Sequence, residues 1–271
     1  MALREYLHLL ENNGELHRTK TKIDPVLELT EIARRALKEG KPALFVENPK
    51  GSNFPLVVNH FAGAKRIELA LGRHPDQIGE ELIGFLERIF PPTLKSLIEN
   101  RSTLRKFIRS RPRLVSSGTS QEVVSGPDLD ALPIQLCWPG DGGRFITYGQ
   151  VITYDPRQSR PGVGKRNIGI YRMHVFDRAA TGMHWQIQKG GGFHYFQSEK
   201  LGKEFELAVA LGTSPALLLA SVAALPEGLD EASLVELYLF RHDVRVLGHL
   251  PEYRIVQGVE LASLPFLDQI F

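Results

Sequence analysis

The chain has a single cysteine, Cys137, among its 271 residues. One thiol cannot close a disulfide within the chain, and it excludes a zinc site built from several thiolates. Lysine and arginine number 33 against 31 aspartates and glutamates, so the formal net charge is only +2. General binders of nucleic acid or of anionic membranes carry many more uncompensated cations. We therefore expect no nucleic-acid partner.

Long hydrophobic runs are also missing. The longest nearly apolar run covers residues 216–225 and is closed by Pro226, which is about half the length of a membrane helix. Charged residues interrupt the first 18 residues too often for a secretory signal. Hydrophobic residues make up 42% of the chain and charged residues 24%, which is typical of a folded protein with a sizeable core. These features predict a cytoplasmic protein.

Residues 1–75 combine helical and strand patterns. Leu3, Tyr6, Leu7 and Leu10 recur at helical spacing and predict a first helix. A second helix is expected to begin after Asp24, with Pro25 in its first turn. The apolar positions expected on its buried face are Leu29, Ile32, Ala33, Ala36 and Leu37.

Two apolar runs follow, at residues 42–47 and 55–59, and they predict strands of a sheet covered on both faces. Residues 64–71 predict another helix, and residues 76–114 a helical region broken at Pro91 and Pro92. The basic run 104–113 indicates a solvated helix face, with a local anion contact as the alternative.

From residue 116 the pattern changes to short β-rich segments separated by glycine, proline and aspartate turns. Strands are expected at residues 147–154, 167–175, 183–187 and 205–212, and an apolar helix at 215–225. Several short strands with such turns predict a barrel or a sandwich.

The segment 167–172 contains the first candidate for a functional site. Strand alternation places Arg172 on the same face as Ile168 and Ile170. Such an arginine lies either at a strand end on the surface or against a buried anion, and the residues alone favour the surface.

A second candidate is the segment 183–192, where Lys189 precedes three glycines. Backbone N–H groups of glycines can approach an anion closely, and Trp185 offers a flat face to an aromatic ring. A hairpin loop beside a core tryptophan explains the same residues. His184 and His194 have no recognised metal-ligand spacing. The carboxylates of residues 226–231 indicate a solvated helix start or, alternatively, a ligand of a hard cation.

The whole chain resembles the UbiD family of decarboxylases. The resemblance lies in residues 3–16, 23–33, 42–48 and 137–147, and most specifically in the segment 167–172 with Trp185 and residues 189–191. It implies an α+β protein with an N-terminal α/β domain over residues 1–110 and a split β-barrel over residues 115–271 that binds prenylated FMN. Mn²⁺, or another divalent cation, and K⁺ would join the flavin phosphate to the protein.

The resemblance also implies roles for single residues. Asn167 and Glu231 would be metal ligands, as would Gln188, which stands where many relatives have a histidine and binds manganese less strongly. Arg172 would orient the substrate carboxylate as the catalytic residue. The residues expected to contact the cofactor are Ile170, Tyr171, Arg172, His184, Trp185, Gln186, Lys189 and Gly190.

The implied reaction is the decarboxylation of an aromatic or α,β-unsaturated acid, of the polyprenyl-hydroxybenzoate or menaquinone-precursor type. A flavin prenyltransferase would supply the cofactor, the chain would form a homo-oligomer, and a lipophilic substrate would allow peripheral membrane association. Family members continue past the position of Phe271 and have their acidic catalytic residues there, so we expect this chain to lack the C-terminal domain. Alone it should bind flavin weakly and release no carbon dioxide. A flavin-binding or assembly module and a simple FMN oxidoreductase are the alternatives.

Overall fold

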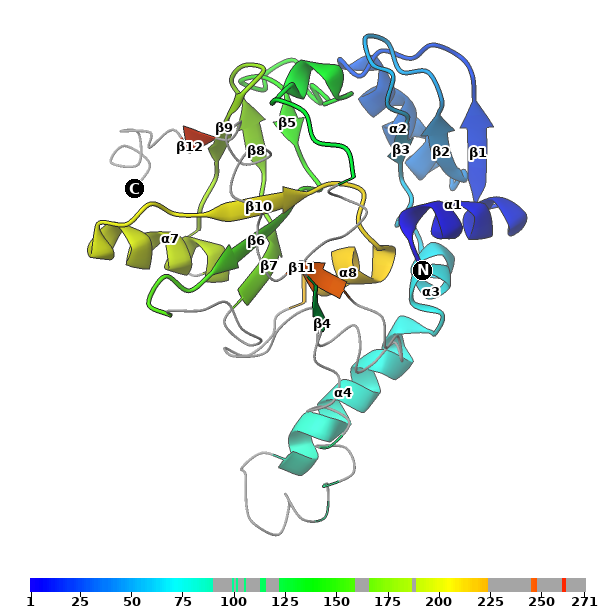
Figure 1. Ribbon diagram of the computed structural model, residues 1–271. Coiled ribbons are helices and arrows are strands. Elements are labelled where there is room, and N and C mark those ends of the chain that lie inside the picture. Colours follow the sequence, from blue (N-terminus) through cyan, green and yellow to red (C-terminus); the bar gives the residue numbers. More distant parts are fainter. Residues whose placement is uncertain are drawn as a thin grey trace.

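The computed structural model describes residues 1–89, 113–115, 122–158, 166–186, 189–223, 245–247 and 260–261, with the single residues Glu99, Arg101 and Arg105. Figure 1 shows a small unit of helices and strands at the N-terminus, which lies beside further sheets that carry α7. The helices are α1 (Leu3–Asn12), α2 (Glu28–Lys38), α3 (Ala64–Leu71), α4 (Pro75–Ile89), α7 (Gly190–Leu201) and α8 (Pro215–Ala220). The strands are β1 (Leu16–Thr19), β2 (Ala43–Val46), β3 (Leu56–Val58), β4 (Arg113–Val115), β5 (Phe145–Ile146), β6 (Gln150–Tyr154), β7 (Arg166–Ile170), β8 (Met173–Val175), β9 (Ala180–Met183), β10 (Leu207–Ala210), β11 (Arg245–Leu247) and β12 (Glu260–Leu261).

A three-stranded sheet forms the centre of the N-terminal unit. β1 runs parallel to β2, and β3 pairs antiparallel with the other edge of β2. Side chains of β2 alternate between the two faces of the sheet. Ala43 therefore packs with Tyr6 of α1 and Ala70 of α3, whereas Val46 packs with Leu29 of α2. The prediction of a sheet covered on both faces is confirmed.

The start of α2 differs from the prediction. The helix begins at Glu28, because Asp24 uses its carboxylate to accept the backbone N–H of Val26 at 2.9 Å. Leu27 then takes a positive φ of 65° before the helix starts. Leu37, which was expected on the buried face, is 55% exposed and lines an open pocket beside β3. The predictions of α1 and α3 are confirmed.

Two antiparallel sheets follow and share one core. β6 lies between β7 and β10, while β8 lies between β5 and β9, with β12 parallel to β9 at the edge. Val151 of β6 and Leu207 of β10 pack in the same cluster as Ile146 of β5 and Met173 of β8. The α+β class is therefore confirmed. Within the described part of the chain, hydrogen bonds do not join these sheets into a closed barrel.

The predicted strand 167–175 is in fact two strands in different sheets. β7 ends at Ile170 and β8 begins at Met173, so Tyr171 and Arg172 form the joint between the sheets. Because the strand stops there, Arg172 does not share a regular strand face with Ile168 and Ile170, which corrects the prediction. The joint leaves the side chain of Tyr171 buried and that of Arg172 exposed.

Other boundaries also differ from the predictions. β9 ends at Met183 instead of extending to residue 187, and the glycine triplet begins α7 rather than turning a hairpin. α8 ends at Ala220, and residues 224 and 225 of the predicted helix lie outside the described residues. The proline pair at 91–92, most of the basic run and the carboxylates at 226–231 lie outside them too. No described helix has the length and apolar character that crossing a bilayer requires.

Candidate flavin and substrate site

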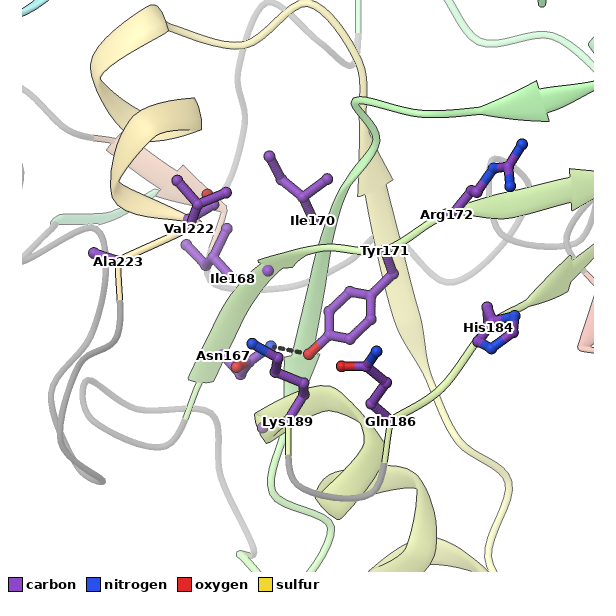
Figure 2. Close-up of a pocket in the computed structure, with 13 residues that line it drawn as sticks. Asn167, Ile168, Ile170, Tyr171, Arg172, His184, Gln186, Lys189, Val222 and Ala223 are labelled. Carbon is purple, nitrogen blue, oxygen red and sulfur yellow. Dashed lines mark hydrogen bonds between the residues drawn. The ribbon is translucent and has the colours of Figure 1, made fainter. Parts of the chain in front are cut away.

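A cavity of about 680 Å³ opens beside β7, between α7 and the end of α8. This volume is within the range of small-molecule sites, roughly 300–1,000 Å³. The residues that line it come from three separate segments of the chain. They are Asn167, Ile168, Gly169, Ile170, Tyr171, Arg172, His184, Gln186, Lys189, Gly190, Ser221, Val222 and Ala223. The structure thus gathers eight of the predicted site residues around one cavity (Figure 2).

Tyr171 is the centre of this arrangement. Its side chain is 7% exposed and meets the ring of Trp185 edge to face, with ring centroids 4.9 Å apart. Gly169 leaves room for the tyrosine, because a Cβ atom there would lie 2.6 Å from the Tyr171 ring. Trp185 packs against the core of the two sheets and is not among the described residues that line the cavity. Its predicted cofactor contact stays a prediction; its observed role is to support Tyr171.

The N-terminus of α7 closes one end of the cavity. The Tyr171 hydroxyl accepts the backbone N–H of Gly191 at 2.8 Å, and the Asn167 side-chain amide donates to the same oxygen at 3.4 Å. A Cβ atom on Gly190 would overlap the side-chain oxygen of Asn167. Only glycine therefore allows the helix start and Asn167 to lie so close together.

Arg172 lies at the other end. Its side chain is 48% exposed, and its guanidinium carbon lies 3.8 Å from the centre of the Phe145 ring. Nη2 donates to both carboxylate oxygens of Asp141 at 3.4 Å. Figure 2 shows that Arg172 points away from Asn167, Lys189 and the Tyr171 hydroxyl, which lie together. The cavity therefore has two separate cationic ends.

The charge of the cavity wall suits an anion. Lys189 and Arg172 carry positive charge, and no aspartate or glutamate is among the described lining residues; the carboxylate that pairs with Arg172, Asp141, lies outside this lining. Lys189 also occupies the N-cap position of α7, where the helix dipole favours negative charge. A phosphate or a carboxylate is therefore a better ligand for this wall than a cation.

Two of the three predicted metal ligands lie outside the residues that the structure describes. Asn167 lines the cavity, but Gln188 and Glu231 lie outside the described residues. The described residues contain no group of three histidine, cysteine, aspartate or glutamate side chains that could hold a metal. Asn167 offers one neutral side-chain oxygen at the cavity, and its role as a metal ligand stays a prediction, like those of Gln188 and Glu231.

Sequence reasoning missed the third segment of the wall, Ser221 to Ala223. Ser221 follows α8, and its hydroxyl donates to the carbonyl of Leu217 at 2.7 Å. The buried side chain of Gln150 bonds both this hydroxyl and Thr213. Gln150 in β6 is fully buried in the structure, and its bonds fix the position of Ser221. The sequence does not show that this glutamine is buried, so it could not be used to predict the third segment.

Solved structures share this architecture. HmfF, a UbiD-class enzyme of Pelotomaculum thermopropionicum solved in complex with FMN, matches with a TM-score of 0.71 and 25% identity, over 93% of this chain and 51% of that chain. The vanillic acid decarboxylase of Sedimentibacter hydroxybenzoicus in its closed form matches in fold with a TM-score of 0.76, at 23% identity, over 95% of this chain and 52% of that chain.

Relatives match in sequence over most of this chain. An uncharacterized protein of Aquifex aeolicus is 38% identical over 98% of this chain, and an uncharacterized protein of Archaeoglobus fulgidus is 42% identical over 84% of it. The matched regions are 55% and 47% of these relatives, so the chain spans about half the length of the curated relatives it matches.

Two family models account for the two parts of the fold. The model of the 3-octaprenyl-4-hydroxybenzoate carboxy-lyase N-terminal domain matches residues 7–86, which contain the β1–β2–β3 sheet. The model of the Rift-related domain of the same carboxy-lyase matches residues 113–247, which contain the cavity. Together with the structural matches, these ranges show that the chain belongs to the UbiD family.

Proposed function

We propose that this protein binds prenylated FMN in the cavity beside β7 and acts as a carboxy-lyase on an aromatic or α,β-unsaturated acid. The observation that supports this most strongly is the arrangement of two cationic ends in one cavity of a UbiD-family chain. One end is the glycine-rich start of α7 with Lys189, and the other is Arg172. The cofactor phosphate and the substrate carboxylate are two anions that need two such ends.

The phosphate fits the start of α7. Backbone N–H groups in the first turn of a helix have no partner within the helix, and they point toward the phosphate position. Gly190 allows the Asn167 side chain to lie against the helix start, and Lys189 adds a full positive charge. The Gly191 N–H donates to Tyr171 and the Lys189 N–H donates to the carbonyl of Gln186, so within the described lining of this end the Gly190 N–H is left for the phosphate.

Cations would complete this end of the site. We propose that Asn167 binds Mn²⁺, or another divalent ion, through its side-chain oxygen, with Gln188 and Glu231 as the other protein ligands and K⁺ nearby. Mn²⁺ accepts such oxygen donors, and it would neutralise a phosphate dianion better than Lys189 alone.

The reaction breaks the bond between the carboxylate carbon and its neighbour, and carbon dioxide leaves. Bound prenylated FMN supplies an electron sink for the released pair. Arg172 binds the carboxylate through its planar guanidinium and orients this bond toward the flavin. A proton then replaces carbon dioxide on the carbon, so the reaction involves no net oxidation. We assign this proton to no described residue.

Substrate and partners belong to the same proposal. The acid is of the polyprenyl-hydroxybenzoate or menaquinone-precursor type, and a flavin prenyltransferase supplies the cofactor. A homo-oligomer is supported by an evolved dimeric form of HmfF among the structural matches. A long apolar tail on the substrate would bring the protein to a membrane surface.

Because these 271 residues alone are expected to release no carbon dioxide, the test uses an active full-length form of the protein. It is incubated with prenylated FMN, Mn²⁺, K⁺ and a panel of aromatic and unsaturated acids, and carbon dioxide is measured. Release that Arg172→Ala lowers by roughly two to three orders of magnitude supports the proposal. Release that this variant leaves unchanged contradicts the role of Arg172. Flavin binding without release of carbon dioxide from any acid favours the binding or assembly module instead.

A further inference from the structure

Arg172 makes two contacts outside the cavity wall, one with the turn that carries Asp141 and one with Phe145 at the start of β5. Its guanidinium lies over the ring of Phe145, and Nη2 bonds the carboxylate of Asp141. Phe145 covers one face of the guanidinium, and Asp141 binds its Nη2. Within the described residues, Nε and Nη1 donate no hydrogen bond, so donors of the guanidinium remain for an incoming carboxylate.

The carboxylate of Asp141 is itself fixed. Its Oδ2 accepts the backbone N–H of Trp138 at 3.2 Å, and its own backbone N–H donates to the carbonyl of Trp138 at 3.0 Å. The Asp141 side chain is 17% exposed, far less than the arginine it contacts. The acid is therefore the rigid partner of this pair, and the long arginine side chain is the one that gains order.

The turn that carries Asp141 is also held on the strand that follows Arg172. Phe145 pairs with His174 in the β5–β8 ladder, and the rings stack with centroids 4.5 Å apart. The carbonyl of Arg144 accepts the N–H of Val175 at 2.9 Å. A Cβ atom on Gly143 would lie 2.5 Å from the His174 ring, so this glycine allows the turn to lie flat on β8.

We infer that Asp141 is a positioning residue for Arg172, an inference that rests on the proposed function. Asp141 and Phe145 fix the plane of the guanidinium, so that its remaining donors face the substrate carboxylate at the rim of the cavity. Without the aspartate, Arg172 loses its anchored corner and samples other rotamers in solvent. The carboxylate then has to order this side chain on binding.

The test compares Asp141→Asn with a matched control, Asp130→Asn, in the protein loaded with prenylated FMN and metal. Asparagine at 141 keeps an oxygen that can accept the Trp138 N–H, so the turn remains and only the charge is lost. Asp130 forms a similar exposed ion pair with Arg144, whose Nη2 lies 2.5 Å from its carboxylate, but does not contact Arg172. The measurements are kcat/KM for an aromatic acid and the solvent exchange of the Arg172 Nε–H in NMR spectra.

We expect Asp141→Asn to lower kcat/KM roughly two- to fivefold, the size expected of an exposed pair, and to speed exchange of the Arg172 signal. Asp130→Asn should change neither. In an Arg172→Ala background, Asp141→Asn should cause no further loss, because it acts only through the arginine.

Two results overturn the inference: an unchanged Arg172 exchange rate in Asp141→Asn, or an additional loss of activity in the Arg172→Ala background. The exchange measurement needs no turnover, so it tests the role of Asp141 even where the proposed function fails. If the proposed function fails, Arg172→Ala and the wild type release carbon dioxide equally.

Discussion

The phenolic oxygen of Tyr171 accepts the backbone N–H of Gly191 at 2.8 Å, so a residue between two sheets caps the first turn of α7. Both residues are buried, and Gly191 is a glycine because a Cβ atom there would lie 2.6 Å from the ring of Trp185. This single bond connects the joint between β7 and β8 to the helix start that we assign to the phosphate.

Tyr171→Phe should reduce the free energy of unfolding by about 1–3 kcal/mol, because it leaves a buried N–H without its acceptor. Urea denaturation followed by circular dichroism measures this change. Tyr195→Phe is the matched control: its hydroxyl donates to Glu199 at 3.2 Å in an exposed position, and its loss should cost less than about 0.5 kcal/mol. Equal losses in the two variants contradict the capping role.

Gly190→Ala should weaken flavin binding, because the new methyl group displaces Asn167 from the start of α7. We expect at least roughly a tenfold rise in Kd, since anion contacts to the helix start are charge-assisted. The control is Gly79→Ala in the middle of α4, where a Cβ atom has no neighbour within 4 Å. Alanine there should leave binding unchanged and stabilise the helix slightly. A Gly190→Ala protein that binds FMN as the wild type does contradicts the assigned position of the phosphate.

Much of the fold could be predicted because its signals are local. The spacing of Tyr6, Leu7 and Leu10 identifies α1, and the continuous apolar run of β2 predicts a sheet with two covered faces. The joint after Ile170 could not be predicted, because residues 167–175 have a continuous strand pattern. β7 and β8 differ in the sheet to which each belongs, which depends on strand pairing that the local sequence does not show. The same holds for α7: three glycines are poor helix formers, and packing against Tyr171 and Trp185 overrides that preference.

The site residues also include some that the sequence indicated and some that it did not. Arg172 and Lys189 stood out in the sequence, whereas Asp141 and Ser221 did not, since their roles arise from turns that bring distant segments together. The resemblance to the UbiD family carried the functional assignment further than residue patterns could.

His60 should make the protein sensitive to acid. The side chain is 6% exposed, its Nδ1 has no hydrogen-bond partner within the described residues, and burial lowers the pKa of His60 to about 4. An unfolded histidine has a pKa of about 6.5, so between these values the unfolded state takes up a proton that the folded state refuses. The stability is fully present above pH ~6.5 and falls by about 3 kcal/mol as the pH drops to ~4.

Chemical denaturation of wild type and His60→Phe at several pH values measures this. Phenylalanine should remove that part of the acid sensitivity, while His17→Gln, a change at an exposed position of β1, should keep it. Identical pH profiles for wild type and His60→Phe would show that another group is responsible.

The account depends most directly on the assignment of the phosphate to the start of α7, and one titration tests it. FMN and riboflavin differ only by the phosphate, so the ratio of their dissociation constants isolates that contact even where both ligands bind weakly. We predict that FMN binds roughly ten- to a hundredfold more tightly than riboflavin, and that Lys189→Ala and Gly190→Ala each remove most of this advantage. Equal affinity for the two ligands, or a preference for FMN that both variants retain, would contradict the account.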